Sequence, residues 1–262
     1  MTIRIAAVGD IHLGTGGTGT LRPALEGLGE QADLLLLAGD LTRHGTAEEA
    51  SVVAEEFADV PVPVIAVLGN HDYHGDVPDE VAAILAARGI RTLESQAAIV
   101  DVSGCRVGIA GTKGFGGGFA GHALDAFGEP EIKAFARRSA ACADGLAAAL
   151  DDLRAAGCGI RIALTHYAPV PDTLAGESPE IYPFLGSYLL AQAIDASGAD
   201  LAVHGHAHSG TERGMTSGGV KVRNVAQPLL GRAYALYHLD EENGQTPSTR
   251  RVEIGEPSTA VS

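Results

Sequence analysis

Three apolar segments recur at steps of thirty residues in the first third of the chain, and a polar residue follows each of them. The segments span 3–8, 33–38 and 64–68, and the polar residues are Asp10, Asp40 and Asn70. About thirty residues is the length of one strand–helix–strand unit. Parallel strands end at a common edge of their sheet, where α/β proteins usually bind ligands. The spacing therefore predicts an α/β fold with three polar side chains along one edge of a parallel sheet.

The segments that connect these strands carry helix signals. Helices are expected at about 21–30, 46–57 and 79–87. Thr46 followed by Glu49 is a capping-box pattern at the start of the second helix. Four consecutive leucines in the second strand show no polar alternation, which is typical of a strand covered on both faces. Both observations favour a sheet buried beneath helices.

The rest of the chain repeats this pattern after an interruption. A glycine-dense loop, 111–128, suits neither a helix interior nor a regular strand, and is interpreted either as a surface insertion or as a lid. Pro130 and Gly157 bracket a long predicted helix, as helix termini prefer. The remaining predicted strands lie at 90–93, 97–102, 106–110, 159–164, 199–203, 220–225 and 233–239, and the remaining helices at 130–156 and 185–196.

The composition of the chain and the absence of certain sequence motifs argue against several classes of protein. The formal net charge is −15 and no basic run is present, so we expect neither an extended nucleic-acid surface nor a membrane partner. No apolar stretch approaches the roughly 20 residues of a membrane span. Three cysteines without a CxxC motif, and no evident signal peptide, favour a cytoplasmic location. No linker divides the chain, so we expect one domain, 1–253, and a mobile tail, 254–262.

Further polar side chains follow the later strands and join the first three. The full set is Asp10, His12, Asp40, Asn70, His71, His166, His206 and His208. Carboxylate, amide and imidazole donors without a thiolate suit Mn, Fe or Zn. The set is too large for one tetrahedral zinc, which takes four ligands at most. Two cations that share one carboxylate account for the number of donors.

The motifs GDIH, GDLT, GNHD, TH and GHAH, in this order between residues 9 and 208, resemble the signature of the calcineurin-like metallophosphoesterases. The ordered combination is specific, whereas GDLT or TH alone would be weak. The resemblance implies a four-layer α/β/β/α sandwich of two mixed β-sheets flanked by helices. It also implies a dinuclear-metal phosphoesterase, and the form of the GDLT motif is closest to the cyclic-nucleotide phosphodiesterase-like branch.

The resemblance further implies a role for each residue of the set. Asp10, His12 and His208 would hold one metal, Asn70, His166 and His206 would hold the other, and Asp40 would bridge the two. His71 would act as the acid beside the phosphate, and Asp72 would orient it. The two divalent ions, Mn²⁺ or Fe in preference to Zn²⁺, would generate a bridging hydroxide that attacks a small-molecule phosphodiester.

Two alternatives to a phosphodiesterase remain open. The chain could be a phosphomonoesterase acting on nucleotides, sugar phosphates or phosphoproteins, or a non-catalytic metal-binding scaffold on the same fold. The presence of every ligand and of His71 argues against the scaffold. His44, Lys113 and Tyr167 are candidate substrate contacts, although an exposed loop position is a competing interpretation for His44 and Tyr167. His204 precedes its strand tip and is interpreted as structural.

Overall fold

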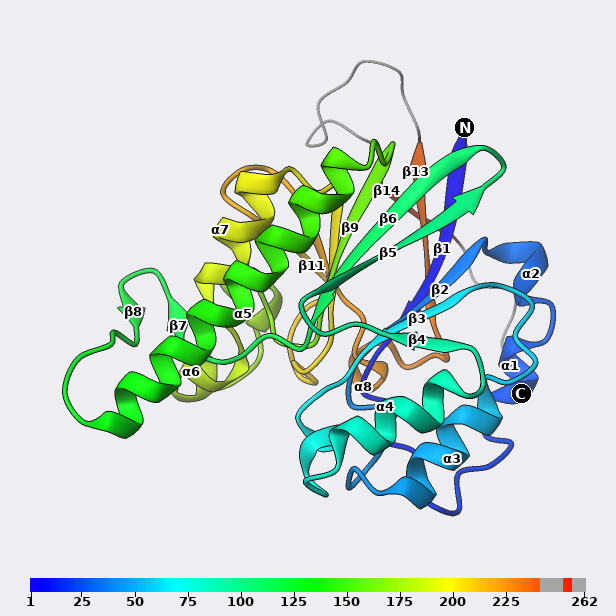
Figure 1. The fold of residues 1–262 in the computed structure, drawn as a ribbon, viewed down its shortest axis with the longest axis horizontal. Coiled ribbons are helices and arrows are strands. Elements are labelled where there is room, and N and C mark those ends of the chain that lie inside the picture. Colours follow the sequence, from blue (N-terminus) through cyan, green and yellow to red (C-terminus); the bar gives the residue numbers. More distant parts are fainter. Residues whose placement is uncertain (241–251, 256–262) are drawn as a thin grey trace.

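A computed structural model describes residues 1–240 and 252–255 of the chain. Two six-stranded β-sheets pack face to face, and helices cover the outer face of each sheet (Figure 1). A small hairpin of β7 (Gly118–Phe119) and β8 (His122–Ala123) projects at one end of the molecule. These layers confirm the predicted α/β fold and its α/β/β/α order.

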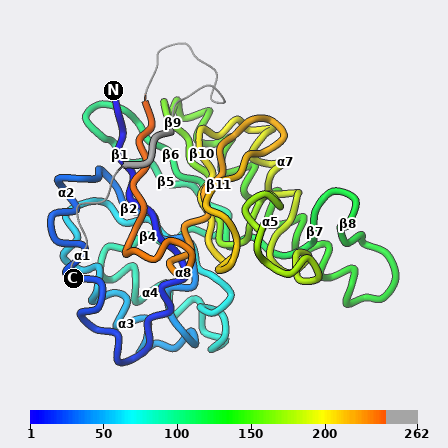
Figure 2. The backbone as a smooth tube through the Cα atoms, turned by 180° about the vertical axis from the view of Figure 1, so that it is seen from behind, coloured from blue at the N-terminus to red at the C-terminus, as the bar shows by residue number. Residues whose placement is uncertain are grey.

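The first sheet contains the three strands whose spacing predicted it. Its strands are β1 (Thr2–Val8), β2 (Leu34–Ala38), β3 (Val64–Val67), β4 (Ile90–Thr92), β13 (Ala235–Asp240) and β14 (Val252–Gly255). They lie in the order β14-β13-β1-β2-β3-β4, with β1 to β4 parallel to one another. Figure 2 shows β13 lying against β1, with which it pairs antiparallel although the two come from opposite ends of the chain.

The second sheet is also mixed, with one antiparallel strand at each edge. Its strands are β5 (Gln96–Val102), β6 (Cys105–Thr112), β9 (Ile160–Thr165), β10 (Leu201–His204), β11 (Arg213–Met215) and β12 (Lys221–Asn224), in the order β11-β12-β10-β9-β6-β5. The four central strands are parallel, and the two edge strands are antiparallel to their neighbours. The carboxyl ends of its central strands therefore share one edge, as do those of the first sheet.

The helices of the fold are α1 (Arg22–Leu25), α2 (Leu28–Gln31), α3 (Ala47–Glu56), α4 (Pro78–Ala86), α5 (Pro130–Ala155), α6 (Tyr182–Leu185), α7 (Tyr188–Ser197) and α8 (Gln227–Leu230). Short 3₁₀ turns lie at η1 (His71–Tyr73), η2 (Pro171–Leu174) and η3 (Pro179–Ile181). Helices α1 to α4 pack on the first sheet, and α5 and α7 pack on the second. No described helix combines the length and apolarity needed to cross a membrane.

The four-leucine run shows how the sequence specifies these layers. Leu34 and Leu36 pack between the two sheets, whereas Leu35 and Leu37 pack beneath the helices, and all four are fully buried. Alternate side chains of a strand point to opposite faces, so an unbroken apolar run buries both faces. The expectation that this strand is covered on both sides is confirmed.

Two helix termini also follow their sequence signals. The Thr46 hydroxyl accepts a hydrogen bond from the Glu49 N–H at 3.2 Å, as half of the predicted capping box. The Glu49 carboxylate instead accepts from the backbone N–H of His44 at 2.6 Å. Helix α5 begins at Pro130, and Gly157 beyond its end has a φ of 73°.

Several expectations were wrong in detail. The helix predicted at 21–30 is two short helices, because Gly27 adopts a φ of 75° between them. The segment 111–128 is not irregular throughout, since β6 continues to Thr112, residues 111–119 are largely buried, and β7 and β8 form a hairpin. Strand β11 and helix α8 were not predicted. Residues 254 and 255 of the expected tail lie in β14, and 256–262 lie outside the described residues, so the boundary at 253 stays a prediction.

Candidate metal centre

The carboxyl edges of the two sheets bring the predicted donors together. Asp10, Asp40 and Asn70 follow strands β1, β2 and β3 of the first sheet. His166 follows β9, and His206 and His208 follow β10, in the second sheet. Asp10, Asp40 and the three histidines, together with His12 and His71, form three overlapping groups whose donor atoms lie within 4.8 Å of one another and could hold a cation.

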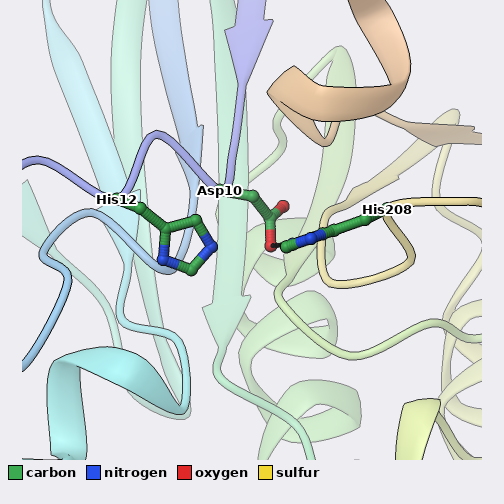
Figure 3. Close-up of side chains that lie close together, drawn as sticks. All are labelled: Asp10, His12 and His208. Carbon is green, nitrogen blue, oxygen red and sulfur yellow. Dashed lines mark hydrogen bonds and ion pairs between the residues drawn. The ribbon is translucent and has the colours of Figure 1, made fainter.

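The first group consists of Asp10, His12 and His208. In Figure 3 the Asp10 carboxylate points to the His208 ring, and the His12 ring lies on the other side of Asp10. The His208 Nε2 is 3.0 Å from Asp10 Oδ1. Among the described residues, the buried His12 Nε2 has no hydrogen-bond partner. A buried ring nitrogen rarely goes unsatisfied, so this atom is a site for a ligand outside the protein chain.

The second group consists of Asp40, His166 and His206, with Asn70 beside it. The His166 Nε2 lies 3.4 Å from Asp40 Oδ1 and 2.9 Å from Asn70 Oδ1. The other ring nitrogen of His166 donates to the Ala38 carbonyl at 2.9 Å, which fixes the ring with Nε2 toward the donors.

Asp40 lies between the two groups. Its Oδ1 is near His166 in the second group, whereas its Oδ2 is 3.8 Å from the His12 Nε2 of the first. A third group of possible ligands joins His12, Asp40 and His71. The two oxygens of one carboxylate thus face both groups, which is the arrangement that the expected bridging role requires.

The backbone at these donors is strained. Seven non-glycine residues of the described chain have positive φ angles, and four of them are Asp10, His12, Asp40 and His206. Such conformations cost on the order of 1–3 kcal/mol each and cluster at functional sites. Backbone hydrogen bonds hold them here, including Asp10 N–H to Gly39 O at 2.9 Å and His12 N–H to Asp40 O at 3.0 Å.

Steric crowding explains why the first residue of the GNHD motif, Gly69, is a glycine. A Cβ atom at Gly69 would overlap the Asp40 carboxylate and lie 2.8 Å from its Cγ. Gly205 of the GHAH motif is similar, because a Cβ there would overlap Asp10 Oδ2. Because they lack a side chain, Gly69 and Gly205 let the backbone pass close to candidate ligands that follow other strands.

His71 is positioned by two backbone contacts. Its N–H donates to Asp40 Oδ1 at 2.8 Å, and its ring Nδ1 is 2.8 Å from the Arg43 carbonyl oxygen. The His71 and His12 ring centres are 4.5 Å apart. His71 therefore stands beside the centre with a ring nitrogen still available, although it is not one of the seven expected metal ligands.

The Asp72 carboxylate bonds to groups other than the His71 ring, so any orientation of His71 by Asp72 is indirect. It is fully buried and accepts hydrogen bonds from the backbone N–H groups of Leu41, Thr42 and Gly69 and from the Thr42 hydroxyl, at 2.6–3.2 Å. No hydrogen bond joins its side chain to His71 in the described part of the chain. Asp72 instead ties the tips of β2 and β3 together, and the Arg43 carbonyl orients the His71 ring.

Burial sets the protonation of the candidate ligands. Desolvation lowers the pKa of His166 well below its usual value and that of His206 to about 3. Both imidazoles are therefore neutral near pH 7, which is the form that binds metals. Desolvation raises the pKa of Asp10 to about 6, although the hydrogen bond from His208 opposes the shift. A nearby cation would stabilise the ionised form of this buried carboxylate.

The positions near the tips differ in their surroundings. His204 is buried, with Nε2 2.8 Å from the Thr173 hydroxyl, which confirms its structural interpretation. His44 is exposed and pairs with Glu49 at 2.8 Å. Tyr167 is 8% exposed and its ring centre is 4.4 Å from that of His206, so it is not an exposed loop residue. Lys113 is buried at the carboxyl end of β6.

Sequence reasoning missed two residues that hold the site through their backbone. The Arg43 carbonyl contacts His71, and the Phe184 carbonyl lies 3.2 Å from His206 Nε2. The latter contact leaves Nδ1 as the His206 nitrogen available to a metal. Because both contacts use a carbonyl group that every residue has, the identity of the side chain carries no signal for them.

Three solved structures resemble the fold at low sequence identity. A phosphopantetheinyl hydrolase from Mycobacterium tuberculosis has a TM-score of 0.62 and 18% identity, covering 98% of each chain. The calcineurin-like phosphoesterase YfkN from Bacillus subtilis has a TM-score of 0.56 and 16% identity, over 97% of this chain and 90% of the other. A 5′-nucleotidase precursor from Thermus thermophilus has a TM-score of 0.58 and 18% identity, and this chain, 97% covered, spans 54% of its length.

A search of curated proteins returned no match. The sequence does match the profile of the family described as calcineurin-like phosphoesterase, over residues 3–210. That range contains every donor of the two groups and His71. The chain therefore belongs to the calcineurin-like phosphoesterase family.

Proposed function

We propose that this chain is a phosphodiesterase that depends on two divalent metal ions. The observation that carries the proposal is that the Asp40 carboxylate lies between two groups of donors, with one oxygen near His12 and the other near His166. The donors fit such ions, because they offer only carboxylate, amide and imidazole atoms, and because His12 Nε2 is buried without a partner among the described residues.

We propose that seven ligands divide between the two cations. One ion would be held by Asp10, His12 and His208, the other by Asn70, His166 and His206, with Asp40 shared. When bound, the ions supply Lewis acidity, activation of a water molecule and neutralisation of charge on the phosphate oxygens. Mn²⁺ and Fe are proposed before Zn²⁺, because a site with this many oxygen and nitrogen donors suits ions of higher coordination number.

The residues of the chain supply orientation and proton transfer. His71, its Nδ1 held by the Arg43 carbonyl, would present Nε2 to the phosphate and donate a proton to the departing alkoxide. Asp72 would keep His71 in register indirectly, by joining the strand tip that carries it to the tip that carries Asp40. Tyr167, packed on His206, would limit the movement of that ligand.

The preference for diesters is supported by the GDLT motif, in which Arg43 stands where a GD-x-x-D motif would have an acidic residue. On this basis we propose substrates like those of the cyclic-nucleotide branch. A cytoplasmic location is proposed as well, supported by the absence of a CxxC motif in the sequence.

One observation favours phosphomonoester hydrolysis as a second candidate. Lys113 is buried on the same sheet edge, and its charge acts on Asp40 and on His166. Additional positive charge beside the centre suits a dianionic substrate better than a monoanionic one.

The test is a comparison of hydrolysis rates after loading purified protein with Mn²⁺. The proposal predicts a higher kcat/KM for bis(p-nitrophenyl) phosphate than for p-nitrophenyl phosphate, together with hydrolysis of 3′,5′-cyclic AMP. A strong preference for the monoester would support the second candidate instead. Binding of two metals without hydrolysis of any ester would favour the scaffold.

A further inference from the structure

Lys113 occupies a strand tip that the metal ligands leave free. It directly follows Thr112, the last residue of β6, which pairs with Thr165 at the end of β9. The Lys113 carbonyl accepts hydrogen bonds from the N–H groups of His166 and Tyr167, at 3.0 and 3.1 Å. Lys113 is thus joined to the backbone of a candidate ligand of the second metal.

The side chain of Lys113 is buried and, among the described residues, forms no close ion pair, although the carboxylate of Glu94 accepts a hydrogen bond from the Lys113 backbone N–H at 3.0 Å and its charge acts on the amine. The residue is 6% exposed, and its Nζ lies 4.7, 5.1 and 5.4 Å from the ring centres of Tyr73, Phe115 and Tyr167. Among the described residues, no carboxylate oxygen lies within ion-pair distance of this amine. Buried lysines are almost always paired, so an amine that packs on aromatic faces and forms no close ion pair can still attract an anion.

The amine lies on the side of the centre proposed for the second metal. The Tyr167 ring is close to both Lys113 and His206, because its centre lies 5.4 Å from the amine and 4.4 Å from the His206 ring centre. Its charge acts on Asp40 and on His166, which belong to the second group of donors. Any substrate phosphate held beside Asp40 and His166 therefore lies within the electrostatic field of Lys113.

The net charge of the centre together with Lys113 affects which substrate charge the site favours. Two divalent cations offset the ionised Asp10 and Asp40 with positive charge to spare, and Lys113 adds to the excess. A simple diester brings one negative charge, whereas a phosphomonoester, or a diester that carries another phosphate, brings about two or more. The extra charge of Lys113 stabilises the second kind of substrate more strongly than the first.

We propose that Lys113 is a specificity-determining residue that favours substrates with a second negative charge at or next to the reacting phosphate. This inference rests on the proposed phosphoesterase function and narrows its substrate class. The second charge has two chemical sources, a monoester dianion or an additional phosphate on a diester. The competing explanation is that Lys113 only braces the three aromatic rings.

The test variant is Lys113→Met, which keeps the approximate length of the side chain and removes its charge. Lys113→Arg retains the charge, and Lys133→Met makes the same change on α5, outside the ring cluster. The dissociation constants of inorganic phosphate and dimethyl phosphate are measured by calorimetry in Mn²⁺-loaded protein. Turnover is compared for p-nitrophenyl phosphate and bis(p-nitrophenyl) phosphate, and for thymidine 5′-(p-nitrophenyl phosphate) with and without a 3′-phosphate.

We expect Lys113→Met to weaken phosphate binding roughly tenfold and dimethyl phosphate binding only about threefold, because the Coulomb energy is proportional to the charge of the ligand. The kcat/KM should fall by about tenfold for substrates with the second charge and by about threefold for substrates without it. The pair of substrates in which the more highly charged member shows the larger loss of kcat/KM identifies the source of that charge. Lys113→Arg should restore the preference, and Lys133→Met should match the wild type.

Equal losses for all ligands and substrates, or no loss, would overturn the inference. The inference also fails if Lys113→Arg recovers the melting temperature but not the phosphate preference. If the methionine variant fails to fold, Lys113→Gln takes its place in the same measurements. If the wild type binds phosphate but hydrolyses none of the esters, the proposed function fails, whereas the ratio of the two dissociation constants still tests Lys113.

Discussion

Gly69→Ala adds a single methyl group at the point where the structure is least able to accept it. The new Cβ would lie 2.8 Å from Asp40 Cγ, whereas carbon atoms in contact are normally about 3.5–4.0 Å apart. The Asp40 carboxylate would therefore have to move by roughly 0.7–1.2 Å, and the Asp40 backbone nitrogen, which the Cβ would also overlap, would have to move as well. Gly69 itself has no positive φ, so the backbone accepts alanine and the effect is steric.

A displacement of this size affects both groups of donors, because each includes Asp40 or lies beside it. We expect the affinity for both metals to fall about 10–100-fold, the range seen when the support of a metal ligand is lost. Activity at limiting Mn²⁺ should fall at least as much, since an error of about 1 Å in catalytic geometry can cost about 10²-fold. Overpacking should also lower the free energy of unfolding by about 1–3 kcal/mol.

The assay is metal content after dialysis against a graded series of Mn²⁺ concentrations, with turnover of bis(p-nitrophenyl) phosphate in the same samples. Gly16→Ala is the matched control, because a Cβ there would meet no atom within 4 Å. Wild-type metal affinity and turnover in Gly69→Ala would refute the claim that Asp40 is a ligand held in place by close packing.

The other predictions concern single residues of the site. His71→Ala should lower kcat about 10²–10⁴-fold while two metals stay bound by elemental analysis, and loss of metal would show that His71 is a ligand instead. Asp40→Ala should lose both metals, so retention of one would argue against a shared carboxylate. Asp72→Ala should lower the free energy of unfolding by about 3–5 kcal/mol in urea, because buried donors lose their acceptor, and unchanged stability would contradict its role between the strand tips. Chelation should abolish hydrolysis and Mn²⁺ should restore it, whereas hydrolysis that survives complete metal removal would contradict the mechanism.

Much of the fold was predictable because its signals are local and repeated. The steps between Asp10, Asp40 and Asn70 identified three parallel strands, and the leucine run identified the strand buried on both faces. The grouping of the donors was also predictable, because residues at the carboxyl ends of parallel strands must share an edge. Each sheet contributes its own donors, and their meeting across the sandwich was implied by the family resemblance.

The remaining features depend on contacts that the sequence does not display. Asp72 follows His71 in a motif, yet its carboxylate turns inward to three backbone N–H groups, which sequence adjacency cannot indicate. The glycine-dense segment looked irregular because glycine weakens strand and helix signals alike, but Gly117 and Gly118 donate to the carbonyls of Pro183 and Gly186. The burial of Lys113 depends on rings from three separate parts of the chain.

The most direct test of the central claim is a crystal structure of Mn²⁺-soaked protein with anomalous scattering recorded for manganese. The account predicts two anomalous peaks on either side of Asp40, one among Asp10, His12 and His208 and the other among Asn70, His166 and His206. A single peak, or two peaks away from Asp40 while manganese is in excess, would contradict it.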